Sequence, residues 1–341
     1  MEVVDRGVER RAEDVLRRAI VIDAMGGALV HPDRWIAGGV TATNVTLAYW
    51  DTDNFRATLR NITHYYDVIE TYPDRLLLVE TAADIERAKR EGKVGIIFGV
   101  QNGTPIEDDL TLLPVFHRLG LRIFQLTYMG RNLIGDGVME REDRGLTYFG
   151  GQVIRELNRL GILVDLSHVG PRTAADALQA SRAPVVCTHC NPKAVRDVPR
   201  NITDGQIRAV VAKGGVVGAV AYSQFAETRP DVRPTMDDFI THLEYLVRVA
   251  GPEHVGIGTD ILESNTEVSW HAYTRTYQDV IGPYENLETE WPVGFARETF
   301  YRHVAEALLR KGYKEADIMG ILGGNFLHVF TQVWDNALPV R

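Results

Sequence analysis

Residues 161–201 read GILVDLSHVGPRTAADALQASRAPVVCTHCNPKAVRDVPRN, and this stretch decides the fold. It holds two apolar runs with the length of β-strands, residues 162–167 and 184–188, on either side of a helical segment. Strand, helix and strand in succession predict two parallel neighbours in one sheet. A histidine follows each run directly, so His168 and His189 should both emerge at the carboxyl edge of that sheet. At that edge, parallel α/β folds carry their chemistry.

The rest of the chain repeats this alternation of apolar runs and helical segments. There are eight such runs, at residues 19–24, 43–50, 94–100, 122–128, 162–167, 184–188, 215–222 and 255–260. Eight strands that alternate with helices predict a (β/α)8 barrel, the TIM barrel. An open doubly wound sheet would show the same periodicity, but the count of eight and the absence of a GxGxxG turn after the first run favour the barrel.

The C-terminal part of the sequence has a different character. Residues 261–291 are polar and aromatic without a clear period, which predicts a long loop over the barrel mouth. Helices are expected at residues 295–311, 314–322 and 325–334. Because no repeat or low-complexity linker interrupts the chain, we expect one domain over residues 1–341. Its barrel would cover about 19–265 and its loop and helical tail about 261–341.

The composition restricts the class of protein and its partners. With 341 residues, 45% hydrophobic and 24% charged, the chain is typical of a soluble globular protein. A net charge of −9 argues against a nucleic-acid partner. No apolar run approaches the ~20 residues of a membrane span, and the charged N-terminus lacks the apolar core of a signal peptide. We therefore expect a small molecule as partner and no membrane.

The sequence has two cysteines, Cys187 and Cys190, which flank His189. On a strand they would point to opposite faces, so a disulfide between them is not expected. Cys-Thr-His-Cys looks like half of a zinc motif, but a structural zinc site needs a second pair of ligands. The simplest prediction is a pair of free thiols in a reducing cytoplasm.

Polar side chains stand at the ends of several predicted strands: Gln101, Asn102, Tyr128, His168, His189, Tyr222 and Asp260. Two histidines and one aspartate at one rim could hold a divalent metal such as zinc, which would polarise a carbonyl and acidify a water. Asp260 could instead act as a general base beside the metal. The residues alone leave other interpretations open: strand-end histidines that only bond loops, an aspartate that caps a loop, and an Arg200 that lies on the surface.

These residues resemble the renal, or membrane, dipeptidases, peptidase family M19 of the amidohydrolase-like barrels. The resemblance runs from about residue 21 to residue 325 and rests on IEDDLTLLPVFHRLGLRIFQLTY, GLTYFGGQVIRELNRLGILVDLSHV, APVVCTHCNPKAV with VPRNITDGQIRAV, and HVGIGTD. It implies a barrel with a metal centre and a dimeric assembly. It also implies that His168 and His189 are metal ligands, that Asp260 is the acid–base carboxylate and that Arg200 holds the carboxylate of the substrate.

The sequence departs from the family pattern at four positions. Met25 and Gly27 replace the His-x-Asp pair that ends the first strand, Gln101 replaces the glutamate that bridges two metals, and Tyr128 replaces a substrate-contacting histidine. A neutral amide brings no charge to offset two cations. We therefore expect at most one divalent ion, zinc or else iron or manganese, on His168 and His189.

Two further predictions complete the expected metal site. Gln101 or Asp260 could supply a third ligand, with water as the fourth. A rival site with two metals would need another acidic ligand, for which Asp23 and Glu263 are the nearest candidates.

Three functions fit this sequence. The first is a metal-dependent hydrolase of an amide or related bond in a small carboxylate-bearing molecule. Its catalytic residues would be Asp260, Tyr128 and Gln101, and its substrate-binding residues Arg200, Asn102 and Tyr222. The second is a lyase or decarboxylase on the same rim, in which tyrosine and amide side chains donate hydrogen bonds to a developing oxyanion. The third is a catalytically silent relative that binds a small molecule. A homodimer is compatible with each.

Overall fold

The computed structural model describes residues 2–27, 31–230, 232–261 and 291–336. The loop predicted at residues 261–291, which includes Glu263, lies outside the described residues except at its two ends. None of the described helices is both long and apolar enough to cross a membrane.

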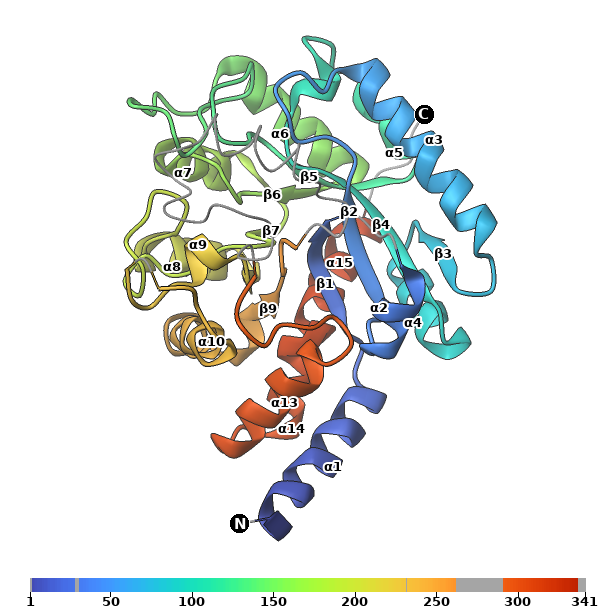
Figure 1. The fold of residues 1–341 in the computed structure, drawn as a ribbon. Coiled ribbons are helices and arrows are strands. Elements are labelled where there is room, and N and C mark those ends of the chain that lie inside the picture. The colour runs from blue at the N-terminus through green and yellow to red at the C-terminus, as the bar shows by residue number, and fades with distance from the viewer. Residues whose placement is uncertain (1, 28–30, 231, 262–290, 337–341) are drawn as a thin grey trace.

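Eight parallel strands form the barrel, with helices packed around it (Figure 1). Six pair in sequence order: β1 (Ile22–Gly27), β2 (Ala42–Thr46), β4 (Val94–Val100), β5 (Leu121–Gln125), β6 (Leu163–Asp165) and β7 (Val185–Val186). The other two, β8 (Val217–Ala219) and β9 (Val255–Ile257), pair with each other. A bridge between Cys187 and Val217 joins β7 to β8. Beyond β9, the backbone N–H of Asp260 donates to the carbonyl of Met25 at 2.7 Å and closes the ring.

The predicted barrel is confirmed, since each of the eight apolar runs contains or overlaps one barrel strand. One strand was missed. β3 (Leu76–Val79) pairs with the first half of β4, on the edge that β5 occupies from Phe98 onward. Only four residues long, it is too short for a period to be visible in the sequence.

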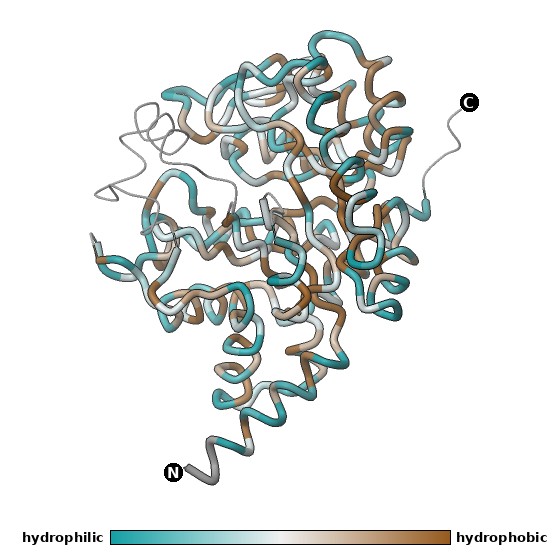
Figure 2. Tube along the Cα trace, turned by 45° about the vertical axis from the view of Figure 1, so that its right-hand side comes forward, coloured by the Kyte–Doolittle hydropathy of each residue, from teal (hydrophilic) through white to brown (hydrophobic). Residues whose placement is uncertain are grey.

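Helices surround the barrel, and six of them lie close to the helical segments that the sequence predicts at residues 55–70, 82–91, 110–119, 172–181, 204–213 and 236–249. They are α2 (Pro32–Ala37), α3 (Phe55–Thr71), α4 (Ala82–Glu91), α5 (Leu112–Arg118), α6 (Tyr148–Leu160), α7 (Pro171–Ala180), α8 (Asp204–Ala212), α9 (Ser223–Ala226) and α10 (Met236–Ala250). Figure 2 shows hydrophobic residues at the centre of the molecule and hydrophilic ones along the outer helices. Burial of these apolar inner faces is the main term that holds such helices on a sheet.

The C-terminal helices close one end of the barrel. The tail contains α13 (Phe300–Arg310), α14 (Glu315–Met319) and α15 (Asn325–Trp334), close to the three predicted ranges. Phe326 of α15 belongs to the same core cluster as Ile22 and Ile123 of the barrel. It lies so close to β9 that a Cβ on Gly256 would come within 2.3 Å of its ring. The opposite, carboxyl end of the strands is left for the polar residues.

Two long helices were not predicted. α1 (Glu2–Arg18) packs beside α13 (Figure 1), and its many charges hide its apolar stripe in the sequence. α6 contains Gly150 and Gly151 in its first turns, and glycine is a weak helix former. Gly150 is needed there because a Cβ would lie 2.2 Å from the carbonyl oxygen of Ile134.

Candidate metal centre

The structure brings His168, His189 and Asp260 together at the carboxyl end of the barrel. The two Nε2 atoms of the histidines are 3.0 Å apart, and Oδ2 of Asp260 lies 3.9 Å from Nε2 of His189. One ligand atom from each residue lies within 4.8 Å of the others, and all three residues are buried. They follow β6, β7 and β9, so the parallel strands convert three distant sequence positions into one cluster.

Two of these residues have a backbone conformation that side chains rarely adopt. His168 has φ 63° and Asp260 has φ 58°, both in the left-handed region. A residue other than glycine is held there at a cost of about 1–3 kcal/mol, and such strain is concentrated at functional sites. Backbone hydrogen bonds anchor both residues. The carbonyl of His168 accepts from the N–H of Val138, and the N–H of Asp260 donates to the carbonyl of Met25.

The protonation states of the three clustered residues suit the binding of a metal cation. Burial lowers the pKa of both histidines well below its ordinary value, and the nearby Arg200 guanidinium adds to the effect. Both imidazoles are therefore neutral at neutral pH, which is the form that binds metal. Burial raises the pKa of Asp260 to about 7, with Arg200 opposing and Asp23 adding to the shift. A divalent ion would favour the ionised carboxylate.

The donor set fits one divalent ion. Imidazole nitrogens bind zinc at about 2.0–2.1 Å, so a single ion can reach two nitrogens that face each other at such a short distance. Two imidazole nitrogens and a carboxylate are ligands that zinc, iron and manganese all accept. With a water as fourth ligand, the set is that of an open, catalytic site.

A buried relay of hydrogen bonds, from His189 through Thr188 to Asp165, orients the His189 ring. Its Nδ1 lies 2.7 Å from Oγ1 of Thr188, and that hydroxyl donates to Oδ2 of Asp165. Because the hydroxyl proton goes to the carboxylate, its oxygen accepts the Nδ1 proton and leaves the Nε2 lone pair facing the site. Asp165 also accepts hydrogen bonds from the N–H and Oγ of Ser167 and from the N–H of Thr188. The carboxylate is thus well satisfied in its buried position.

Arg200 is buried, with only 1% of its surface exposed, so the surface interpretation is wrong. Its Nη2 donates to the carbonyl of His189 at 2.7 Å and its Nη1 to Sγ of Cys190 at 3.3 Å. It lines a cavity of about 150 Å³ together with His168 and Lys193. A guanidinium at this place supplies positive charge beside the centre.

The two cysteines are free thiols, as predicted, and both are buried. Burial opposes ionisation of Cys190, but the hydrogen bond from Cys187 and the neighbouring Arg200 outweigh it and hold the pKa of the Cys190 thiol at about 7. Both cysteines belong to the hydrophobic core and flank His189 in the chain.

Four other predicted site residues, Tyr128, Gln101, Asn102 and Tyr222, each make different contacts. Tyr128 stacks on the ring of His168, with centroids 4.4 Å apart and planes inclined by 28°. Gln101 is buried, and its Oε1 has no hydrogen-bond partner among the described residues. Asn102 bonds to Asp51 at 2.9 Å and to Asn132 at 2.8 Å, so its amide ties loops together. Tyr222 stacks on Phe225, whose ring lies 5.4 Å from the Arg200 guanidinium.

Arg297, from the C-terminal part of the chain, lies beside the cluster and was not predicted as a site residue. Its Nη1 donates to Asp23 at 2.9 Å, and Asp23 also accepts from the N–H and Oγ1 of Thr259 at 2.8 and 2.7 Å. Asp23 is therefore an ion-pair partner rather than a spare acid. Arg297 falls at the start of the helix predicted at residues 295–311, where an arginine is ordinarily a solvent-exposed residue, so nothing in the sequence signals this contact.

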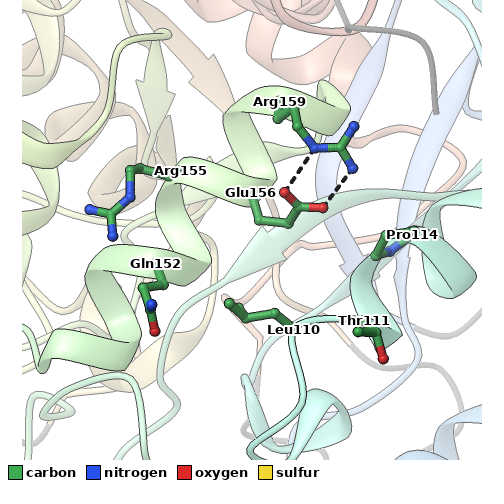
Figure 3. Close-up of a pocket in the computed structure, with 7 residues that line it drawn as sticks. All are labelled: Leu110, Thr111, Pro114, Gln152, Arg155, Glu156 and Arg159. Carbon is green, nitrogen blue, oxygen red and sulfur yellow. Dashed lines mark hydrogen bonds and ion pairs between the residues drawn. The ribbon is translucent and has the colours of Figure 1, made fainter. Parts of the chain in front are cut away.

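A larger hollow of about 520 Å³ lies on the surface between α5 and α6 (Figure 3). Glu156 and Arg159 form an ion pair at 2.6 Å along one side of it; Figure 3 shows the two side chains pointing toward each other. It shares no lining residue with the cavity beside His168, and it gathers no cluster of candidate ligands.

The fold and the cluster define a class: an amidohydrolase-like (β/α)8 barrel with a candidate metal centre at the carboxyl ends of its strands. The chain belongs to peptidase family M19, the membrane dipeptidases, whose pattern it matches over residues 33–281. The members of this family are metal-dependent hydrolases.

Individual proteins support this assignment. An uncharacterized dipeptidase of Schizosaccharomyces pombe is 33% identical over 230 residues, which cover 65% of this chain and 55% of that relative. An amidohydrolase from Pseudomonas aeruginosa is 32% identical and superposes with a TM-score of 0.87 over 95% of this chain and 99% of its own. A metallopeptidase from Rhodobacter sphaeroides, 21% identical, shares the fold with a TM-score of 0.78 over 93% of this chain and 100% of its own. Its structure holds a phosphinate mimic of the dipeptide L-Ala-D-Ala.

Proposed function

We propose that the protein is a dipeptidase-like hydrolase with one divalent metal, acting on an amide or related bond in a small carboxylate-bearing molecule. The observation that carries this proposal is the buried cluster of His168, His189 and Asp260, with two imidazole nitrogens 3.0 Å apart. Membership of the M19 family supports the reaction class. The shared barrel of a metallopeptidase that holds a dipeptide mimic supports the size of the substrate.

A single metal fits the residues better than two. A second ion in the same pocket would need further ligands and an anionic bridge to offset its charge. Met25, Gly27 and Gln101 bring no charge to the centre. Asp23, one of the two candidate acids, already accepts hydrogen bonds from Thr259 and from Arg297. Zinc is the first candidate, with iron and manganese as alternatives.

The residues around the cluster can divide the work of hydrolysis. A divalent ion held there would act as a Lewis acid on the substrate carbonyl and acidify a water. In this proposal Asp260 acts as the general base rather than as a third ligand: it would accept a proton from that water and pass it to the leaving nitrogen. Tyr128 and Gln101 could donate hydrogen bonds to the developing oxyanion. The Arg200 guanidinium supplies positive charge for the carboxylate of the substrate.

Two further features support the proposed compartment and the proposed kind of partner. Both cysteines are buried free thiols, which supports the reducing environment of a cytoplasm. The partner we propose is a small molecule rather than a nucleic acid, because the chain is acidic.

Metal content and product analysis test the proposal together. Protein purified without added metal should contain up to one equivalent of a divalent ion by elemental analysis, and replacing His168 and His189 by alanine should abolish it. Incubation with dipeptides and N-acyl amino acids should release a free amine and a free acid. Two equivalents retained through dialysis would overturn the single-metal assignment, and decarboxylated or eliminated products would point to a lyase. Absence of both metal and turnover would leave a silent binding protein.

A further inference from the structure

Asp260 is held by its backbone rather than by its side chain. Its Oδ2 lies 3.9 Å from Nε2 of His189, too far for a hydrogen bond, whereas its backbone N–H donates to the carbonyl of Met25 at 2.7 Å. Its left-handed backbone, with φ 58°, is one that a residue other than glycine adopts only where neighbouring structure enforces it. Something must therefore hold the chain on both sides of this residue.

Arg297 contacts both chain neighbours of Asp260. Its Nη1 donates to Oγ1 of Thr259 at 3.2 Å, and its Nη2 donates to the carbonyl of Ile261 at 3.1 Å. The same Nη1 donates to Asp23 on β1 at 2.9 Å. One guanidinium thus ties the turn that carries Asp260 to the first strand of the barrel, from both sides of the turn.

The surroundings of Arg297 are built for this side chain. Only 1% of its surface is exposed, and its guanidinium stacks on the ring of Trp35 at 3.8 Å. Trp35 reaches this place because Gly26 has no side chain, since a Cβ there would lie 2.4 Å from the Trp35 ring. A planar fork can stack and serve three acceptors at once, which the compact ammonium of a lysine cannot do.

We propose that Arg297 is a positioning residue, which holds Asp260 at the metal centre by clamping Thr259 and Ile261. This inference rests on the proposed function, because it assigns Asp260 a role at that centre. It assigns Arg297 no contact with metal or substrate. A purely structural ion pair with Asp23 would make a different prediction, since it would affect stability without a specific effect on the metal site.

The experiment compares Arg297→Lys with Arg122→Lys as a matched control. Arg122 is also a buried arginine, and it donates to three carbonyls, of Glu80, His117 and Leu121, at the start of β5 and away from the metal centre. Affinity for zinc is measured by competition with a chromophoric chelator, and stability by thermal denaturation of the metal-free proteins. Losing an outer partner of a metal site typically weakens binding about 10–100-fold. We expect a loss of that size in Arg297→Lys, and unchanged affinity in Arg122→Lys.

A second variant covers the case in which Arg297→Lys does not fold. Arg297→Met combined with Asp23→Asn removes both buried charges together, and replacing a whole buried pair is often tolerated. Weaker zinc binding in this folded double variant supports the clamp. Wild-type affinity in either folded Arg297 variant overturns it, as does an equal loss of affinity in Arg122→Lys.

Failure of the proposed metal centre can be told apart from failure of the Arg297 clamp. If the wild-type protein binds no divalent ion under any condition, the proposed function fails, and the clamp is judged by crystal structures of wild type and Arg297→Lys. Displacement of the Asp260 backbone from its left-handed conformation in the variant supports the clamp. An unmoved Asp260 overturns it.

Discussion

Replacing Thr188 by valine should weaken metal binding through His189 without changing the shape of the site. Valine has nearly the same volume as threonine but lacks the hydroxyl that lies 2.7 Å from Nδ1 of His189. Without that acceptor, the Nδ1 proton has no partner and the imidazole can move its proton to Nε2 instead. The lone pair would then face away from the metal centre.

The expected size of the effect follows from the contacts that remain. Asp165 keeps three donors, the N–H and Oγ of Ser167 and the N–H of Thr188, so the buried carboxylate stays satisfied. The main cost falls on His189, and a buried polar group without a partner costs about 1–3 kcal/mol. For the metal, loss of the outer partner of a histidine ligand weakens affinity about 10–100-fold. That range corresponds to about 1.4–2.7 kcal/mol of binding free energy.

Zinc competition against a chromophoric chelator, with thermal denaturation of the metal-free protein, measures both effects. Thr188→Ser keeps the hydroxyl and should bind zinc nearly as tightly as the wild type. Thr43→Val is the matched control, because Thr43 is a buried barrel threonine whose Oγ1 has no hydrogen-bond partner among the described residues. It should leave metal affinity unchanged. Wild-type affinity in Thr188→Val would refute the relay.

The remaining predictions concern Arg200, the candidate ligand His189, and His242. Arg200→Lys should raise KM by the equivalent of about 1.5–3 kcal/mol, the usual range for a hydrogen bond to a charged group; unchanged steady-state kinetics would remove Arg200 from substrate binding. His189→Ala alone should abolish stoichiometric metal in elemental analysis, whereas metal retained in this variant would place the site elsewhere. Burial lowers the pKa of His242 from 6.5 to about 4, so its stabilising contribution is complete above pH 6.5 and is lost as pH falls toward 4. Urea titrations of His242→Gln should therefore show a flatter pH dependence in that window, by up to about 3 kcal/mol; an unchanged slope would contradict the assigned shift.

The barrel could be predicted from the sequence because its strands are buried on both faces. Such strands appear as continuous apolar runs, and a run such as Val94–Val100 keeps this character whatever surrounds it. Elements with weaker local signals were missed: β3 is only four residues long, and α6 has two glycines near its start. In these cases tertiary packing overrides local propensity.

The candidate site was partly predictable for a geometric reason. In a parallel barrel, every strand ends at the same rim, so a residue that follows a strand has a known position in space. His168, His189 and Asp260 each lie three residues after the end of a strand. Arg200 lies 14 residues after the end of β7, in a loop whose path no periodicity describes, and its burial was therefore not predicted.

The partner of Asp23 could not be predicted from the sequence, and it bears on whether the site can hold one metal ion or two. A fully buried carboxylate needs a nearby cation or several donors, because an unpaired buried charge costs several kcal/mol. From the sequence, that cation could equally be a metal ion or a distant side chain. In the structure that cation is Arg297, from the C-terminal part of the chain. Arg297 and Thr259 both donate hydrogen bonds to the Asp23 carboxylate. An arginine cannot lose its charge at accessible pH, so Asp23 remains paired and is not released to a second metal. Met25 and Gly27 bring no metal-binding side chains, and Arg297 supplies the positive charge beside β1 from the protein itself. The proposed metal site would then be confined to the side of the barrel that carries His168 and His189.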